Sequence, residues 1–319
     1  MDTTIRGIRQ NGWARARKTL RTMWKDYLLY VMLIPGLVYF ILFKYWPMYG
    51  ITIAFRDYSI YKGFEDAPWV GLDHFISLFT KAGFIRALYN NIIISLQKLV
   101  FGFPVPILLS LLINEVRSRS YKRFVQTAVI LPNFVSWVVI YGLMFAMFST
   151  NSGALKGVLT MFGYKGPIPN ILGNKETFRL VILISHIWKG AGMGTIVYLA
   201  AISGIDPQLY EAAIIDGAGK LARTWHITLG SIRTTIVILL IFRVGEIMNA
   251  GFDQIFAISN SLVVSVADII DTYTYRLGLV QRDYSVATAA GLFKSLVGLI
   301  LVLLTNYTAK KIDEESGIM

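Results

Sequence analysis

The stretch Tyr210-Glu211-Ala212-Ala213-Ile214-Ile215-Asp216-Gly217-Ala218, followed by Ile227-Thr228-Leu229, is a short and mildly polar island between two long apolar segments. Asp206 and Pro207 precede it, a pair typical of the N-cap and the first position of a helix. Good helix formers fill Leu209–Ile215, and Gly217 and Gly219 then break the helix. The island therefore begins as a short helix that ends at a glycine turn.

A second short helix is predicted over Leu221–Ile227, with Leu221 and Trp225 on one face at i, i+4 spacing. Together the two helices form a helix–turn–helix over 206–230 that lies at a membrane surface. One interpretation is that its small knob docks on another protein. The alternative is an amphipathic interfacial hairpin that only links two spans.

The composition indicates an integral membrane protein. The 319 residues are 55% hydrophobic and only 16% charged, with a mean hydropathy of +0.56, whereas soluble domains carry roughly 25% charged residues. Several apolar runs approach the ~20 residues that a bilayer-spanning helix needs. The absence of cysteine excludes disulfides, thiolate catalysis and cysteine-ligated metals, and the three isolated histidines show no metal-binding spacing.

The predicted fold is all-α with six transmembrane helices, because backbone polar groups in lipid must be paired within a helix. Pro35, Pro104, Pro106 and Pro132 are expected to kink three of the spans. The first apolar run is long and lacks a following cleavage site, so it is interpreted as a retained span rather than a signal peptide. The six spans are Tyr27–Tyr45, Asn91–Ile113, Phe124–Phe148, Leu180–Ala201, Ile232–Ile258 and Tyr284–Tyr307.

The net charge of +12 is distributed as in a multi-pass protein rather than a nucleic-acid-binding one. Seven basic residues precede the first apolar run, and four more lie between Arg117 and Arg123. The positive-inside rule places these segments, the hairpin and both termini in the cytosol. The longer loops 46–89, 149–179 and 259–283 lie outside, either contacting other molecules or only joining helices. The expected organisation is a cytosolic arm (1–26), a first helix with its loop (27–87), a core (88–307) and a cytosolic tail (308–319).

The order Glu-Ala-Ala, Asp-Gly-Ala and Ile-x-Leu, between the fourth and fifth spans, resembles the EAA motif of ABC importer permeases. The resemblance covers about 88–307 and is strongest to the carbohydrate-uptake (maltose-type) family, in particular the LplB/YteP-like complex oligosaccharide permeases of Gram-positive bacteria. Gly230 departs from the family pattern, which usually has proline there. Supporting segments are Asn90-Asn91, Leu131-Pro132, Gly251-Phe252-Asp253 and Asp283-Tyr284-Ser285-Val286-Ala287.

The resemblance implies the type I importer permease fold in a bacterial cell membrane, with the hairpin as the coupling helix. The residues so implied are Tyr210, Glu211, Ala212, Ala213, Asp216, Gly217 and Ala218. Their partner would be a separate ATPase that uses ATP and magnesium. The other implied partners are a second, different permease, a second ATPase copy and an extracellular solute-binding lipoprotein that delivers an oligosaccharide.

No cofactor, metal or catalytic site is predicted within this chain. Gly217-Ala218-Gly219-Lys220-Leu221 fails as a phosphate-binding loop because Ile214 stands at its first glycine position and Leu221 at its last position. The glycines at 190, 192 and 194 lack the βαβ unit of a dinucleotide site and are expected to let helices pack closely. The chain is therefore predicted to be a transport subunit without enzymatic activity.

Placing a polar residue inside a membrane span costs free energy, so such residues are candidates for the substrate path. The fifth span carries Arg243 and Glu246 as further polar residues, and an internal pairing of Lys189 or Arg243 with Glu246 or Asp253 is the competing interpretation. Lys189 beside a sugar path would suit an acidic, uronate-containing oligosaccharide. By register with maltose-type relatives, the path includes His186, Trp188, Lys189, Gly190, Met193, Asn249, Phe252, Asp253 and Phe256.

Other function classes remain open at this point. An importer of a non-sugar solute would share the coupling motif. An ion-coupled carrier would be expected to show inverted repeats and broken helices, and neither is visible in the sequence. A purely structural or receptor protein leaves the hairpin unexplained.

Overall fold

The computed structural model describes residues 25–61 and 63–312. Most of the predicted basic arm (1–24) and the end of the predicted tail (313–319) lie outside this range. The chain divides into two compact units, Met1–Ile53 and Ala54–Met319.

The described part of the first unit belongs to a continuous helical run, Tyr27–Phe55, that is long and apolar enough to span a membrane. It consists of α2 (Tyr27–Phe40), η1 (Ile41–Tyr45) and the start of η2 (Trp46–Phe55). It extends the predicted first span by ten residues. Pro35 lies inside α2, which continues through it.

Three further continuous helices of the second unit are long and apolar enough to cross a membrane. The second span is Ala82–Asn114, in which α4 (Ala82–Gln97) leads through the π-helical η3 (Lys98–Gly102) into α5 (Pro104–Asn114). The fourth is α9 (Lys175–Ser203) and the sixth is α17 (Tyr284–Ile312). All three begin earlier than, or end later than, the predicted spans, because polar caps such as Asn174 extend helices beyond the apolar run.

The third and fifth predicted spans are both interrupted, and the kink expected at Pro132 is confirmed in the third. The third consists of α6 (Arg119–Ile130) with η4 (Leu131–Phe134), followed after a 102° bend by α7 (Trp137–Phe148). The bend lies beside Pro132, whose missing N–H and fixed φ end the α-helix. Within the predicted fifth span, α13 (Arg233–Gly245) stops in a linker and the chain resumes as α14 (Phe252–Ile258). The bent helix pairs found among the described residues are Arg119–Phe134 with Trp137–Phe148 and Lys220–Ser231 with Arg233–Gly245, and counting each pair as one span gives up to six spans.

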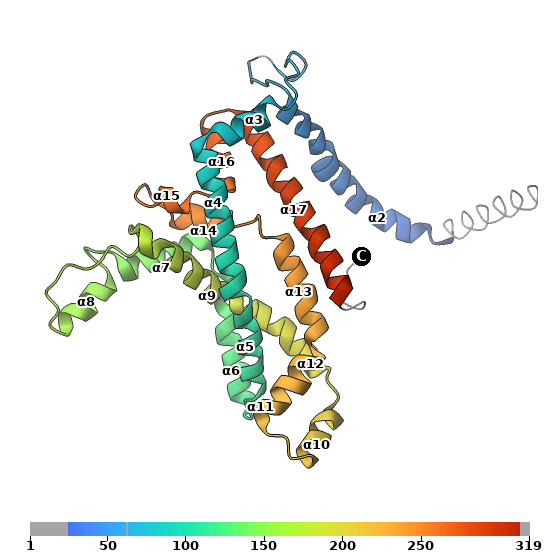
Figure 1. Ribbon diagram of the computed structural model, residues 1–319, viewed down its shortest axis with the longest axis vertical. Coiled ribbons are helices and arrows are strands. Elements are labelled where there is room, and N and C mark those ends of the chain that lie inside the picture. Colours follow the sequence, from blue (N-terminus) through green and yellow to red (C-terminus); the bar gives the residue numbers. More distant parts are fainter. Residues whose placement is uncertain (1–24, 62, 313–319) are drawn as a thin grey trace, which may run out of the picture. The chain divides into compact units, whose positions relative to one another are not determined.

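The predicted loops contain further helices within the described residues. They are α3 (Asp73–Thr80), α8 (Ala154–Met161), α15 (Val264–Ala267), α16 (Ile270–Tyr275) and η6 (Arg276–Val280). In the second unit, α3 and α16 lie at one end of the spans, and the hairpin that contains α10 (Pro207–Ile215) lies at the other end (Figure 1). The two ends of the helical core therefore differ: one carries the short helices α3 and α16, and the other carries the hairpin.

The buried core is formed around α9, which packs along α5 and against α6. One apolar cluster joins α4, α9 and α14 through Ile94, Ile182 and Ile255, each at most 1% exposed. Because lipid tails are as apolar as these side chains, such a core is stabilised by close packing rather than by escape from water. Close packing in turn places the polar side chains of the same helices at defined positions.

A polar network stabilises the end of the helical core that lies opposite the hairpin. Asp268, with its side chain 2% exposed, accepts from Arg276 at 2.6 Å and from Thr272 at 2.8 Å. The hydrogen bond from Arg276 to Asp268 raises the pKa of the guanidinium above its ordinary value. Asn90 of α4 donates to the Asp268 carbonyl at 3.0 Å and accepts from Arg179 of α9 at 2.9 Å. Three parts of the chain far apart in sequence therefore meet here.

Arg276→Met should lower the stability of the folded protein by about 2 kcal/mol. Removing one partner leaves a buried carboxylate unpaired, and the full cost of breaking a buried pair is reduced here because Arg276 is 39% exposed. The midpoint of thermal unfolding in detergent measures it. Lys81→Met is the matched control, since it breaks only the half-exposed 3.9 Å pair with Asp283. Equal shifts for both variants would contradict the role given to Asp268.

Candidate functional site

The hairpin between α9 and α13 forms as local rules predict. The Asp206 carboxylate accepts from the backbone N–H of Gln208 at 2.9 Å, and Pro207 occupies the first helical position of α10. Gly217 has φ +78°, a left-handed conformation that glycine adopts without steric cost. Gly219 is not left-handed and instead precedes α11 (Lys220–Arg223). The sharp turn thus depends on Gly217.

The second arm of the hairpin is more irregular than predicted. The expected helix over 221–227 divides into α11 and the π-helical η5 (Thr224–Thr228), followed by the single turn α12 (Leu229–Ser231). A hydrogen bond of 3.0 Å between the hydroxyls of Tyr210 and Thr228 ties the two arms together. The hairpin is therefore braced from within and can present its outer face as a unit.

That outer face is exposed and partly apolar. Glu211, Ala212, Asp216 and Gly217 are exposed, whereas Tyr210, Ala213 and Ala218 are half-buried. Ile215 and Leu221 are more than 80% exposed. Large exposed apolar side chains beside small residues are typical of surfaces that meet another protein. The predicted coupling residues therefore divide into an outward set and a set that holds the hairpin's shape.

Gly230 has no steric reason to be glycine. It lies in α12, and a Cβ there would have no neighbour within 4 Å. The 61° bend between Lys220–Ser231 and Arg233–Gly245 occurs at the buried Ile232 instead. The departure from the usual proline leaves the entry into α13 intact.

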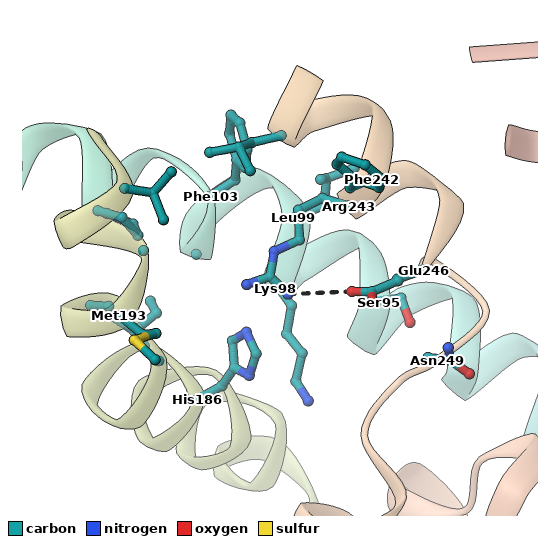
Figure 2. Close-up of a pocket in the computed structure, with 18 of the residues that line it drawn as sticks. Ser95, Lys98, Leu99, Phe103, His186, Met193, Phe242, Arg243, Glu246 and Asn249 are labelled. Carbon is teal, nitrogen blue, oxygen red and sulfur yellow. Dashed lines mark ion pairs between the residues drawn. The ribbon is translucent and has the colours of Figure 1, made fainter. Parts of the chain in front are cut away.

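A cavity of about 580 Å³ lies among the second, fourth and fifth spans. Its walls come from residues 95–106, from Asn133 of η4, from 186–198 of α9, and from 239–249, which covers the end of α13 and the linker after it. Figure 2 shows Arg243, Lys98 and His186 around the same hollow, with Met193 on the α9 side and Asn249 on the linker side. The cavity lies between the hairpin and the network around Asp268.

Four of the nine predicted path residues line this cavity: His186, Gly190, Met193 and Asn249. The other five do not. Trp188 is 49% exposed. Phe252 and Phe256 stack on each other at 5.1 Å and both contact Tyr275, forming an aromatic group outside the cavity lining. The cavity therefore brings together three of the predicted residues on α9 and one residue of the 249–256 segment, and the substrate path itself stays a prediction.

Lys189 points elsewhere. Its ammonium donates to the carbonyl of Asn133 at 2.8 Å and to that of Val135, and lies 5.6 Å from the centre of the Trp137 ring. Among the described residues it forms no ion pair with Glu246 or Asp253. The internal pairing weighed above holds for Arg243, whose guanidinium lies 3.7 Å from the Glu246 carboxylate.

The charged groups of the cavity are Lys98, Arg243 and Glu246. Lys98 did not enter the predicted path, although it is the only charged residue between Ile92 and Ile113, a signal that intramembrane ionisable residues give by default. Two cations against one carboxylate make the cavity a favourable place for an anionic group. His186 and Asn249 add hydrogen-bonding capacity, and Phe103 and Phe242 add aromatic surface.

Comparison with known proteins gives a consistent result. A family model described as the inner membrane component of binding-protein-dependent transport systems matches residues 102–314. The chain is 47% identical over 301 residues to the polygalacturonan/rhamnogalacturonan transport system permease protein YteP of Bacillus subtilis (strain 168), covering 94% of this chain and 93% of that protein. It is also 47% identical over 291 residues to protein LplB of the same organism, covering 91% of each.

A solved structure agrees with these relatives. A chain of a bacterial alginate ABC transporter, crystallised in complex with an alginate pentasaccharide-bound periplasmic protein, superposes with a TM-score of 0.85 at 41% identity, covering 93% of this chain and 99% of that one. The helical architecture is thus that of an ABC transporter permease. The hairpin between two spans, the multi-pass core and the family match together show that this chain belongs to the binding-protein-dependent transport system inner membrane component family, the permeases of ABC importers.

Proposed function

We propose that this chain is the membrane-spanning permease subunit of an ATP-driven importer of acidic oligosaccharides. The observation that carries the proposal is the cavity beside Lys98 and Arg243, which combines two cations with aromatic and hydrogen-bonding side chains. The substrates named for the similar proteins have the matching chemistry: alginate is an acidic polysaccharide, and polygalacturonan is a chain of uronic acids.

The proposed energy source is a separate ATPase that docks on the hairpin. Its exposed face, with Glu211 and Ala212 on α10 and the apolar Ile215 and Leu221 at the tip, supports this assignment. The proposed assembly also contains a second permease, a second ATPase copy and an extracellular solute-binding protein. The hairpin and both termini are placed in the cytosol of a bacterial cell, as the basic segments predict.

Lys98 and Arg243 differ in how free they are to bind a substrate carboxylate. The Lys98 ammonium donates at 2.6 Å both to the Ala250 carbonyl and to Gln254 Oε1, so its bonds are directed at the protein. Arg243 pairs with Glu246 at the longer distance of 3.7 Å, and its side chain is 53% exposed. Figure 2 shows the guanidinium reaching into the cavity beside His186. Arg243 is therefore the group best placed to meet a substrate carboxylate.

Arg243→Gln is expected to raise the KM for a uronate oligosaccharide about tenfold or more, the loss of one charge-assisted hydrogen bond. Uptake of a neutral oligosaccharide of equal length should change little. The measurement is uptake of both labelled sugars into proteoliposomes that hold the complete transporter. Arg233→Gln is the matched control, because Arg233 is exposed at the first position of the same helix and lies outside the cavity.

Two results would contradict the proposal in different ways. Wild-type protein that imports only the neutral sugar would remove the acidic substrate class. Equal losses for both sugars in Arg243→Gln would show that Arg243 has a general role in the fold and does not select the carboxylate.

A further inference from the structure

The linker in the fifth span has backbone carbonyls that do not accept hydrogen bonds from a helix and so need other partners. Residues 246–251 are non-helical between α13 and α14, with Gly251 at φ +96°. Inside a membrane, non-helical backbone requires partners from the protein or from a water-filled cavity. Two partners come from the second span: Asn91 donates to the Met248 carbonyl at 3.1 Å, and Lys98 donates to the Ala250 carbonyl at 2.6 Å. The break is thus held from outside the fifth span.

Lys98 also joins the break to the fourth span. Its ammonium donates at 2.6 Å to Oε1 of Gln254, a residue of α14 that is 1% exposed. The amide of Gln254 in turn donates to the Ile182 carbonyl at 2.7 Å and to the Ser185 hydroxyl at 2.9 Å, both on α9. One lysine therefore connects the second span to the linker and to α14 and, through Gln254, to the fourth span.

The break in the third span is held in the same way. The backbone leaves η4 at Phe134, and α7 begins after Ser136. Lys189 of α9 donates to the carbonyls of Asn133 and Val135 on either side of this point, with its charge over the Trp137 ring. An ammonium offers several donors on a flexible stem, so it can satisfy carbonyls that no longer have helical N–H partners.

Both breaks border the cavity. Asn133 lines it at the third-span break, and Glu246, Ile247 and Asn249 line it at the fifth-span break. The walls opposite them are the two unbroken spans from which Lys98 and Lys189 come. We propose that Lys98 and Lys189 are positioning residues that pin the two broken spans to the two continuous ones and so set the shape of the cavity. This inference rests on the transport role proposed above and is independent of the substrate's charge.

The chain contains no cysteine, so single cysteines can report on each break separately. The two reporters are Asn249→Cys for the fifth span and Asn133→Cys for the third, each in the complete transporter in proteoliposomes. Lys98→Met is expected to raise the rate of thiol modification at position 249 about tenfold, the population change expected for loss of a hydrogen bond to a charged group. Lys189→Met should do the same at position 133, and neither should affect the other reporter.

Conservative variants separate positioning from general stability. Lys98→Arg and Lys189→Arg keep donors near the carbonyls and should restore slow modification. Global loosening would instead accelerate both reporters in either methionine variant, and that result would overturn the proposal, as would rates that do not change. Because labelling needs no transported sugar, it can succeed even if the assigned substrate class is wrong. With substrate, Lys98→Met should raise KM more than it lowers the maximal rate.

Discussion

Glu211→Lys is expected to abolish energised uptake while the protein remains in the membrane at its normal level. Glu211 is exposed on α10 and forms no ion pair with any described residue, so the change costs the fold little. If α10 docks on the proposed ATPase, a reversed charge meets the group that Glu211 attracts. Like charges across an interface cost several kcal/mol, which corresponds to a loss on the order of a hundredfold or more. ATP-driven uptake and the ATPase activity of the same preparation measure the effect.

Glu115→Lys is the matched control for this experiment. It makes the same charge change at an exposed residue directly after α5, away from the hairpin. Gly217→Pro should repeat the Glu211→Lys result by another route, because proline fixes φ near −65° where the native turn has +78°. If Glu211→Lys transports at the wild-type rate, or if Glu115→Lys loses as much transport, the proposed ATPase does not dock at Glu211.

The hairpin shows what sequence can predict about this protein. Asp206, Pro207 and Gly217 act on backbone groups within a few residues of themselves, and each takes the role that local rules assign. The second arm departs from its expected regular helix, and the hydroxyls of Tyr210 and Thr228 join it to the first arm. Such a contact depends on the fold of both arms, and neither residue indicates it alone.

The two broken spans differ in how far the sequence predicts them. Pro132 indicates the bend in the third span, whereas residues 232–258 contain no proline and are apolar throughout most of their length, so nothing in them indicates the break before α14. Carbonyls at the two breaks accept from Lys98 and Lys189, which lie on other spans. The position of Lys189 in its own apolar run gives no indication of these partners. The solitary charge at Lys98 was the available signal for the cavity.

The same contacts bear on the ion-coupled carrier that the sequence left open. Broken helices also occur in such carriers, so the two breaks by themselves do not discriminate between the classes. The family match does discriminate, because the matched family is the inner membrane component of binding-protein-dependent transport systems and the similar solved structure is an ABC transporter.

Gly192→Ala is the second change with a large expected effect, and it acts on folding. A Cβ at Gly192 would lie 2.1 Å from the carbonyl oxygen of Val129 and 2.8 Å from the Cα of Ile130. Both are backbone atoms of α6, so no side chain can rotate away and the two helices must separate. Overpacking of this kind costs about 3 kcal/mol or more. The expected result is a sharply lower thermal midpoint in detergent and little correctly folded protein.

The neighbouring glycines supply graded controls within one helix. Gly190→Ala meets nothing within 4 Å and gains about 1 kcal/mol of helix propensity, so it should keep or raise the midpoint. Gly194→Ala meets the ring of Pro106 at 2.9 Å and should fall between the two. The expected order of thermal midpoints follows from the close approach of α9 to the backbone of α6 at Gly192. Gly192 lies about one helical turn from Lys189, which donates to the carbonyl of Asn133 at the third-span break. A midpoint for Gly192→Ala equal to that of Gly190→Ala would show that α6 and α9 are farther apart, and the third span would then need another anchor.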